Sequence, residues 1–140
     1  MSRKELENLA KVGALKAEPY AEAEFVGLVA SAKKRLADAR NEGLSPESRF
    51  DLAYNASHAY ALAALRYNGF RSAKRYTVFQ ALEHTVGMKS AKWRVFSKCH
   101  GDRNLAEYEG QTEVDPKLLS DLIQVATELE AAVAAFPVPP

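Results

Sequence analysis

The sequence contains one cysteine, Cys99, so it cannot form a disulfide within the chain. It has no apolar run near the roughly 18 residues that a membrane-spanning helix needs, and its charged start, SRKELENLAK, is unlike a signal peptide. These absences argue against a disulfide-stabilised secreted protein and against a membrane protein. We therefore expect a cytoplasmic protein without a membrane partner, whose 140 residues form a single domain over 1–140.

Strand signals are also scarce, because no stretch alternates apolar and polar residues over several positions. Apolar residues instead recur at spacings of three and four, as they do on one face of a helix. Glycines and prolines divide the chain into segments of helical length. We expect helices over 3–17, 20–42, 45–68, 74–86, from Ser90 into the stretch CHGDRNLAEYEG, and from Pro116 onward. The sequence thus predicts an all-α fold without a sheet, an antiparallel bundle of about five to six helices.

The segment 45–68 is predicted to be the central helix. Ser45 and Pro46 provide an N-cap and a first-turn proline, and Gly69 ends the segment. Its middle, YNASHAYALAAL, is alanine-rich and apolar on nearly every side, which is typical of a helix with neighbours all around it. A monomer of this size should leave part of that apolar surface uncovered, so we expect a homodimer with two-fold symmetry.

Charge is unevenly distributed, although the net charge is only +1. Residues 66–103 carry nine basic and two acidic residues, whereas residues 104–140 carry one basic and seven acidic residues. Two interpretations stay open: the basic middle binds an anion such as phosphate or RNA, or it neutralises the acidic C-terminal part within the fold. The side chains that would form the anion-binding surface are Arg71, Lys74, Arg75, Lys92 and Arg94.

The stretch CHGDRNLAEYEG, residues 99–110, concentrates the most reactive side chains of the chain. The three histidines, His58, His84 and His100, fall on three expected helices and form no pair at metal-binding spacing, so we expect no metal and no cofactor. Cys99 and His100 are adjacent, and adjacent helical side chains point about 100° apart. They therefore cannot act as a nucleophile–base pair, and we expect Cys99 to be a small core residue.

Arg103 is the best candidate for an anion-binding residue in this stretch. If Gly101 and Asp102 stop one helix and cap the next, the first free N–H groups of the new turn would lie beside the Arg103 guanidinium. If the helix continues, Arg103 lies one turn after His100 on the same face. In either case His100 is the nearby side chain that can exchange protons near pH 7.

The alanine-rich helix with its glycine (AYNASHAYALAALRYNGFR), the helical pair after it and the polar segment DRNLAEYEG together resemble the HEPN domain, over roughly residues 25–135. This family, named for higher eukaryotes, prokaryotes and nucleotide binding, consists of small all-α bundles that usually dimerise. In many members an arginine, often followed by asparagine, precedes a histidine by a few residues, and two such motifs form a metal-independent RNA-cleaving site. Other members only bind, or pair with a minimal nucleotidyltransferase in toxin–antitoxin systems.

By this resemblance Arg103 and Asn104 match the arginine and asparagine of the motif, and Tyr108 takes the position of its histidine. A tyrosine of pKa about 10 is a poor general base at neutral pH, although it can donate a hydrogen bond to phosphate. The resemblance implies an RNA- or nucleotide-binding module of a toxin–antitoxin or defence system, with degenerate or altered catalysis. The alternatives are a metal-independent endoribonuclease that uses Arg103 with His100 or Tyr108, and an interaction protein that pairs with a nucleotidyltransferase. The ligand-binding residues would be Arg103, Asn104 and Tyr108, with Arg71, Lys74, Arg75 and Arg94.

Overall fold

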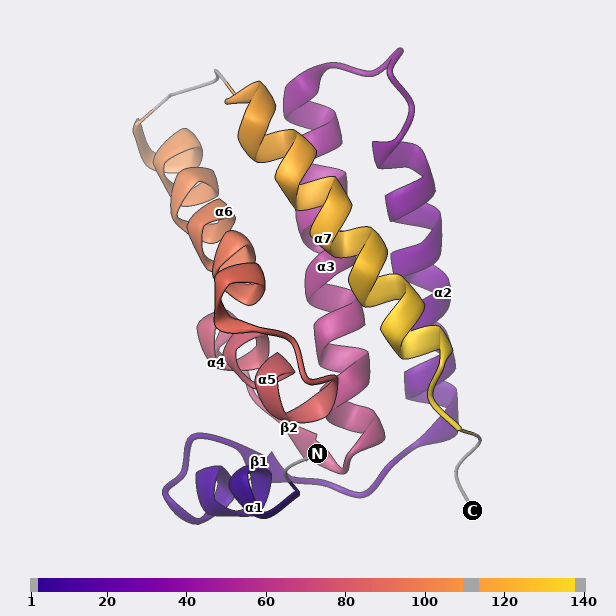
Figure 1. Cartoon of the computed structure of the whole chain (residues 1–140), viewed down its shortest axis with the longest axis vertical. Helices are drawn as coiled ribbons and strands as arrows, with labels where there is room; N and C mark the ends of the chain where they lie inside the picture. The colour runs from indigo at the N-terminus through magenta and orange to yellow at the C-terminus, as the bar shows by residue number, and fades with distance from the viewer. Residues whose placement is uncertain (1–2, 110–113, 138–140) are drawn as a thin grey trace.

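A computed structural model of the chain describes the backbone of residues 3–109 and 114–137, and the side chains of residues 3–101 and 114–137. The described chain is a bundle of helices with one short strand pair (Figure 1). Its elements are α1 (Arg3–Lys11), β1 (Lys16–Ala17), α2 (Glu22–Ala39), α3 (Pro46–Tyr67), β2 (Phe70–Arg71), α4 (Arg75–Gln80), α5 (Leu82–Thr85), α6 (Ser90–Glu109) and α7 (Pro116–Ala134). The predicted all-α bundle is confirmed. The prediction of no sheet was wrong, because the two-residue strands β1 and β2 pair antiparallel.

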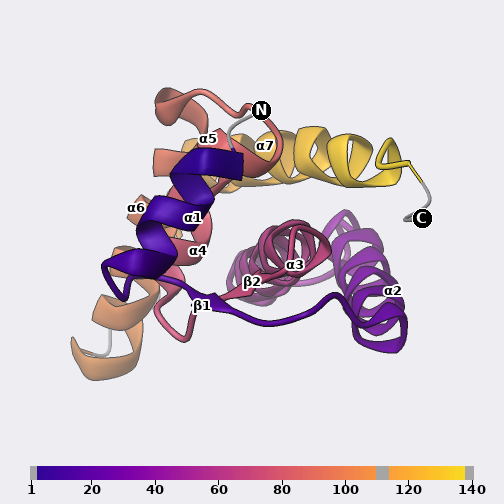
Figure 2. The ribbon, with the colours of Figure 1, turned by 90° about the horizontal axis from the view of Figure 1, so that it is seen from below.

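α3 lies at the centre of the bundle, as its apolar sequence predicted. In Figure 1 α2 lies to its right, α6 to its left, and α7 crosses in front of it, and the view from below in Figure 2 shows the same arrangement. The Ser45 hydroxyl accepts a hydrogen bond from the Ser48 N–H (3.2 Å), so serine caps this helix as expected. Most apolar side chains of α3 are buried by neighbours within one chain. Uncovered apolar surface on α3 therefore gives no argument for a dimer.

The first helix ends earlier than predicted because a glycine caps it. Gly13 adopts a left-handed conformation, with φ +82°, and its N–H donates to the carbonyl of Ala10 (3.1 Å). The next N–H, that of Ala14, donates to the carbonyl of Leu9 (2.9 Å). This pair of bonds is the cap that commonly closes a helix with glycine. The helix predicted over 3–17 was therefore too long, and the chain continues in extended form into β1.

Glycine follows the ends of α3 and α5, but it does not end α2. The single helix predicted over 74–86 was wrong, because the structure divides this segment into α4 and α5. Gly69 (φ +86°) and Gly87 (φ +68°) lie in the left-handed region after α3 and α5, respectively. Gly43 does not, and its N–H donates instead to the side-chain oxygen of Asn41 (2.9 Å). α2 consequently ends at Ala39, before the position that the glycine had indicated.

The guanidinium of Arg66, near the end of α3, is almost completely buried, with 1% of the side chain exposed. Its Nε donates to the Glu24 carboxylate (2.7 Å), and its two Nη atoms donate to the backbone carbonyls of Glu18 (2.8 Å) and Pro19 (2.6 Å). Arg71, in β2, pairs with Glu18 and Glu24 as well. The hydrogen bond from Arg66 holds the pKa of Glu24 below its ordinary value. These ion pairs hold the segment between β1 and α2 against the end of α3.

Replacing Arg66 with alanine should destabilise the fold strongly. The change leaves the Glu24 carboxylate and two backbone carbonyls without their main donor and opens a cavity at the end of α3. We expect the free energy of unfolding, measured by urea denaturation, to fall by about 3–5 kcal/mol. Lys34→Ala, at an exposed position of α2, is the control and should change it by less than about 0.5 kcal/mol. Equal stability of the two variants would contradict the role given to Arg66.

Candidate functional site

α6 carries the stretch that held the strongest sequence signals. It continues without interruption through Gly101, which is not in the left-handed region. The helix start that was one alternative at Asp102 is therefore absent, and so are the free N–H groups that would have bound an anion there. The other alternative, a continuous helix, is the one observed.

Three of the predicted site residues, Arg103, Asn104 and Tyr108, lie in the last turns of α6. Their side chains lie outside the described residues. Arg103 follows His100 by three residues of continuous helix, which is close to one turn. The surroundings of His100 are therefore the part of the predicted site that the structure describes.

His100 contacts Tyr54 of α3. The Tyr54 hydroxyl and His100 Nδ1 share a hydrogen bond of 2.8 Å, and the two rings stack with 6.0 Å between their centroids. Tyr54 is completely buried, so packing on all sides fixes the position of its hydroxyl. A hydrogen bond at one ring nitrogen sets the orientation of an imidazole. The ring of His100 is thus held in one orientation at the contact between α3 and α6.

Arg75, the first residue of α4, also contacts Tyr54. Its guanidinium carbon lies 5.4 Å from the centroid of the Tyr54 ring, as in a cation–π contact. Its Nη1 is buried and has no hydrogen-bond partner in the part of the chain that the structure describes. The tyrosine ring offsets some of the positive charge but supplies no acceptor for this nitrogen.

His58 lies one turn after Tyr54 on α3. The Phe79 ring packs against it edge-on, with 5.9 Å between the centroids. Burial, together with the nearby charges of Arg75 and His100, lowers the pKa of His58 to about 4. His58 is therefore neutral at pH 7. Together Tyr54, His58, Arg75 and His100 form the α3–α4–α6 cluster.

This cluster brings together two residues of the predicted site, Arg75 and His100. Tyr54 and His58 were not predicted as members, although their spacing of four on the central helix places them on the same face. Arg71 is not brought to the cluster. It pairs with glutamates at the other end of α3, so its charge serves the fold there.

The other basic residues of the middle region differ in their surroundings. Lys92 pairs with Glu128 of α7, as the neutralisation of the acidic C-terminal part predicted. Lys74, Arg94 and Lys98 are exposed, the first before α4 and the others one turn apart on α6. Neutralisation therefore accounts for Lys92, whereas these three cations face solvent.

The described residues were also compared with the requirements of a metal site and of a membrane-spanning helix. Within residues 3–101 and 114–137, no three side chains of His, Cys, Asp or Glu are grouped so that they could hold a metal ion. Of the helices in the described chain, none is both long enough and apolar enough to cross a bilayer. Cys99 is fully buried, which confirms that it is a core residue.

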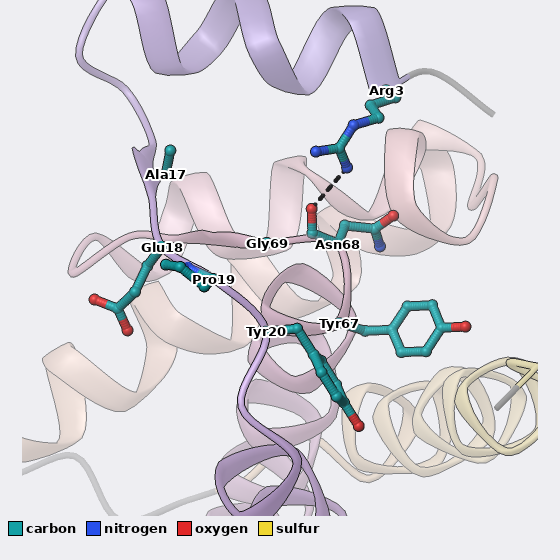
Figure 3. Close-up of a pocket in the computed structure, with 8 residues that line it drawn as sticks. All are labelled: Arg3, Ala17, Glu18, Pro19, Tyr20, Tyr67, Asn68 and Gly69. Atoms are coloured by element: carbon teal, nitrogen blue, oxygen red, sulfur yellow. Dashed lines mark hydrogen bonds between the residues drawn. The ribbon is translucent and has the colours of Figure 1, made fainter. Parts of the chain in front are cut away.

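A cavity of about 430 Å³ lies at the C-terminal end of α3, away from the cluster (Figure 3). Its walls come from the N-terminal segment and from the turn between α3 and β2. The sequence does not predict this cavity, because these two parts of the chain are far apart in the sequence. The residues around it are Arg3, Ala17, Glu18, Pro19, Tyr20, Tyr67, Asn68 and Gly69.

Comparisons with protein-family models, curated proteins and solved structures found no match for this chain. The resemblance to the HEPN domain therefore stays a prediction. The geometry of the chain places a guanidinium and an oriented imidazole against a buried tyrosine, with a neutral imidazole one turn further along α3.

The low pKa of His58 should make the stability of the protein depend on pH. The fold disfavours protonated His58, so the unfolded chain takes up this proton first, near the ordinary histidine pKa of 6.5. Above pH 6.5 His58 is neutral in both states and does not lower the free energy of unfolding. As the pH drops toward 4, the free energy of unfolding should fall by up to about 3 kcal/mol. Urea denaturation across this range measures the loss, and NMR titration of the ring protons measures the pKa of His58.

His58→Gln provides the control for this titration. The variant has no group at this position that titrates between pH 4 and 6.5, so its stability should change less over the range. A measured His58 pKa near the ordinary value would contradict its burial among Arg75 and His100.

Proposed function

We propose that this chain is an RNA- or nucleotide-binding module of the HEPN type, and that its phosphate-binding site lies where α3, α4 and α6 meet. The observation that supports this most directly is the environment of Arg75. One nitrogen of its guanidinium is buried without a hydrogen-bond partner among the described residues, and Arg75 and the oriented His100 both contact Tyr54. Arg103, Asn104 and Tyr108 join this site through the HEPN resemblance.

The chemistry of Arg75 favours a phosphate over a neutral ligand. A buried guanidinium nitrogen without a partner costs free energy that an acceptor would recover. Phosphate oxygens match the planar fork of arginine and accept charge-assisted hydrogen bonds from it. Arg75 is partly exposed as a residue, so part of its side chain is open to solvent beside the buried Nη1.

The neutral state of His58 is consistent with the same role. A second cation next to Arg75 would be repelled, and burial avoids this by keeping His58 uncharged at pH 7. A bound phosphate brings negative charge, which favours protonation of a neighbouring histidine. We therefore expect phosphate binding to raise the pKa of His58.

Exposed basic side chains extend the proposed site over α4 and α6. Arg94 and Lys98 lie one turn apart on α6, and Lys74 precedes α4. Such a group of exposed cations attracts a polyanion, and its contribution weakens with salt because binding releases counterions. In this proposal Lys74, Arg94 and Lys98 contact the backbone of an RNA strand that places one phosphate at Arg75.

The orientation of His100 favours a second candidate function, a metal-independent endoribonuclease. A catalytic histidine commonly has one ring nitrogen held by a second group, and the Tyr54 hydroxyl occupies Nδ1 in this way. The HEPN resemblance supplies Arg103, one turn later on α6. A homodimer in which two such motifs meet, and pairing with a nucleotidyltransferase, stay predictions on the same basis.

Binding of a fluorescent single-stranded RNA tests the proposed site. We expect affinity that falls steeply between about 50 and 200 mM salt. Arg75→Ala and Arg103→Ala should each weaken binding by about 10- to 100-fold, because each removes a charged donor fork. Arg35→Ala is the matched control, since Arg35 is exposed on α2, which lies across α3 from α6 (Figure 1). Circular dichroism checks that each variant is folded, and binding unchanged in both site variants would refute the proposal.

Substitution of His100 separates binding from cleavage. If His100 transfers protons, His100→Ala should lower the rate of RNA cleavage by about 10²- to 10⁴-fold and leave the dissociation constant nearly unchanged. Tyr54→Phe, which removes only the hydroxyl at Nδ1, should lower the rate less. Cleavage that persists unchanged in His100→Ala would rule out the endoribonuclease mechanism with this residue. RNA that is bound and never cleaved identifies a binding module.

A further inference from the structure

We propose that the cavity at the C-terminal end of α3 binds a small planar aromatic molecule that carries a negative charge. This site is separate from the α3–α4–α6 cluster and does not depend on RNA binding. Its volume of about 430 Å³ falls within the usual range for small-molecule sites. The cavity has aromatic walls on the side of the bundle and the guanidinium of Arg3 on the side of α1 (Figure 3).

Tyr20 and Tyr67 form the aromatic wall. Their ring centroids are 5.9 Å apart and the rings are nearly perpendicular, so together they form a corner that a flat ring can fill. Tyr67 stacks on Phe136 with 4.5 Å between centroids, and its hydroxyl donates to the carbonyl of Pro137. Tyr20 packs against Phe25, 5.9 Å between centroids. These contacts fix the wall before a ligand arrives, which lowers the entropy that binding costs.

Arg3 supplies the charge preference. Its Nη1 donates to the carbonyl of Asn68 (2.9 Å), and its guanidinium carbon lies 5.5 Å from the centroid of the Phe70 ring. The one carboxylate paired with it among the described residues is that of Glu7, at 3.5 Å in an exposed pair. Such exposed pairs are weak. The guanidinium is thus positioned at the cavity while most of its charge and several of its donors stay available to a ligand.

Glu18 does not cancel this preference. It is the acidic residue among those around the cavity, and its carboxylate is engaged by Arg71 at 3.0 Å and by Arg66 at 3.5 Å. In Figure 3 its side chain points away from Arg3 and from the two tyrosines. Arg3 is therefore the charged group that a ligand in the cavity meets, and an anionic substituent beside an aromatic ring matches this pair of features.

A pair of matched probes tests this inference. We expect 2-naphthoate to shift the amide NMR signals of Ala17, Asn68 and Gly69, with a dissociation constant of about 1 mM or below. 2-Naphthylmethanol has the same ring without the charge, and it should bind about 5- to 10-fold more weakly because it cannot form the charge-assisted bond to Arg3. Equal affinity of the two probes, or no shifts at these amides, would overturn the proposal.

Two variants and one control complete the test. Arg3→Ala should weaken 2-naphthoate by about 5- to 10-fold and change 2-naphthylmethanol little, since Arg3 supplies the charge whereas Tyr20 and Tyr67 form the aromatic wall. Tyr20→Ala should weaken both probes because it removes part of the aromatic corner. Lys4→Ala, at the neighbouring exposed position, should change neither. Arg3 is exposed on α1, so its substitution leaves the core intact and keeps the test valid if Tyr20→Ala fails to fold. An Arg3→Ala variant that binds 2-naphthoate with the same affinity as the unaltered protein would overturn the proposal.

Discussion

The burial of the Arg66 guanidinium is the interaction on which the lower end of the bundle depends. A buried cation requires acceptors on every side, and one helix cannot supply them. They come from the first turn of α2 and from the segment that follows β1, so both are drawn against the end of α3. β1 then lies beside β2, and α1 crosses the base of the bundle (Figure 2). The cavity exists because this segment is held there.

Alanine sets the second constraint, the close approach of helices to α3. Ala53, Ala56, Ala61 and Ala64 are all buried on α3, and small side chains let neighbouring backbones come near. Polar residues of α3 consequently meet residues of other helices at short range. The bond from Tyr54 to His100 is one such contact, which links α3 to α6 within the core. The small side chains of α3 thus allow the close contacts between helices that form the α3–α4–α6 cluster.

Local signals in the sequence located the helical segments but not all of their ends, and they were insufficient for the site. α7 begins at Pro116 as predicted, and Asp115 caps it by accepting a hydrogen bond from the Lys117 N–H (2.9 Å). The end of α1 was missed because the helix expected over 3–17 ran past Gly13, whose cap is a property of backbone conformation. The partners of Arg66 and the contacts of Arg75 join residues far apart in the chain. Spacing along one helix carries no information on such pairs, so the sequence alone does not predict the cluster.

The complete burial of Cys99 has a practical consequence for the dynamics of α6. A thiol reacts with a disulfide reagent only as an exposed thiolate, so reagent must wait for the helix to move away from the core. Because this is the one cysteine of the chain, the reaction has a single product and no competing site. When closing is faster than labelling, the rate of modification reports the free energy of opening at this position. The chain therefore contains its own reporter for exposure of the helix that bears His100.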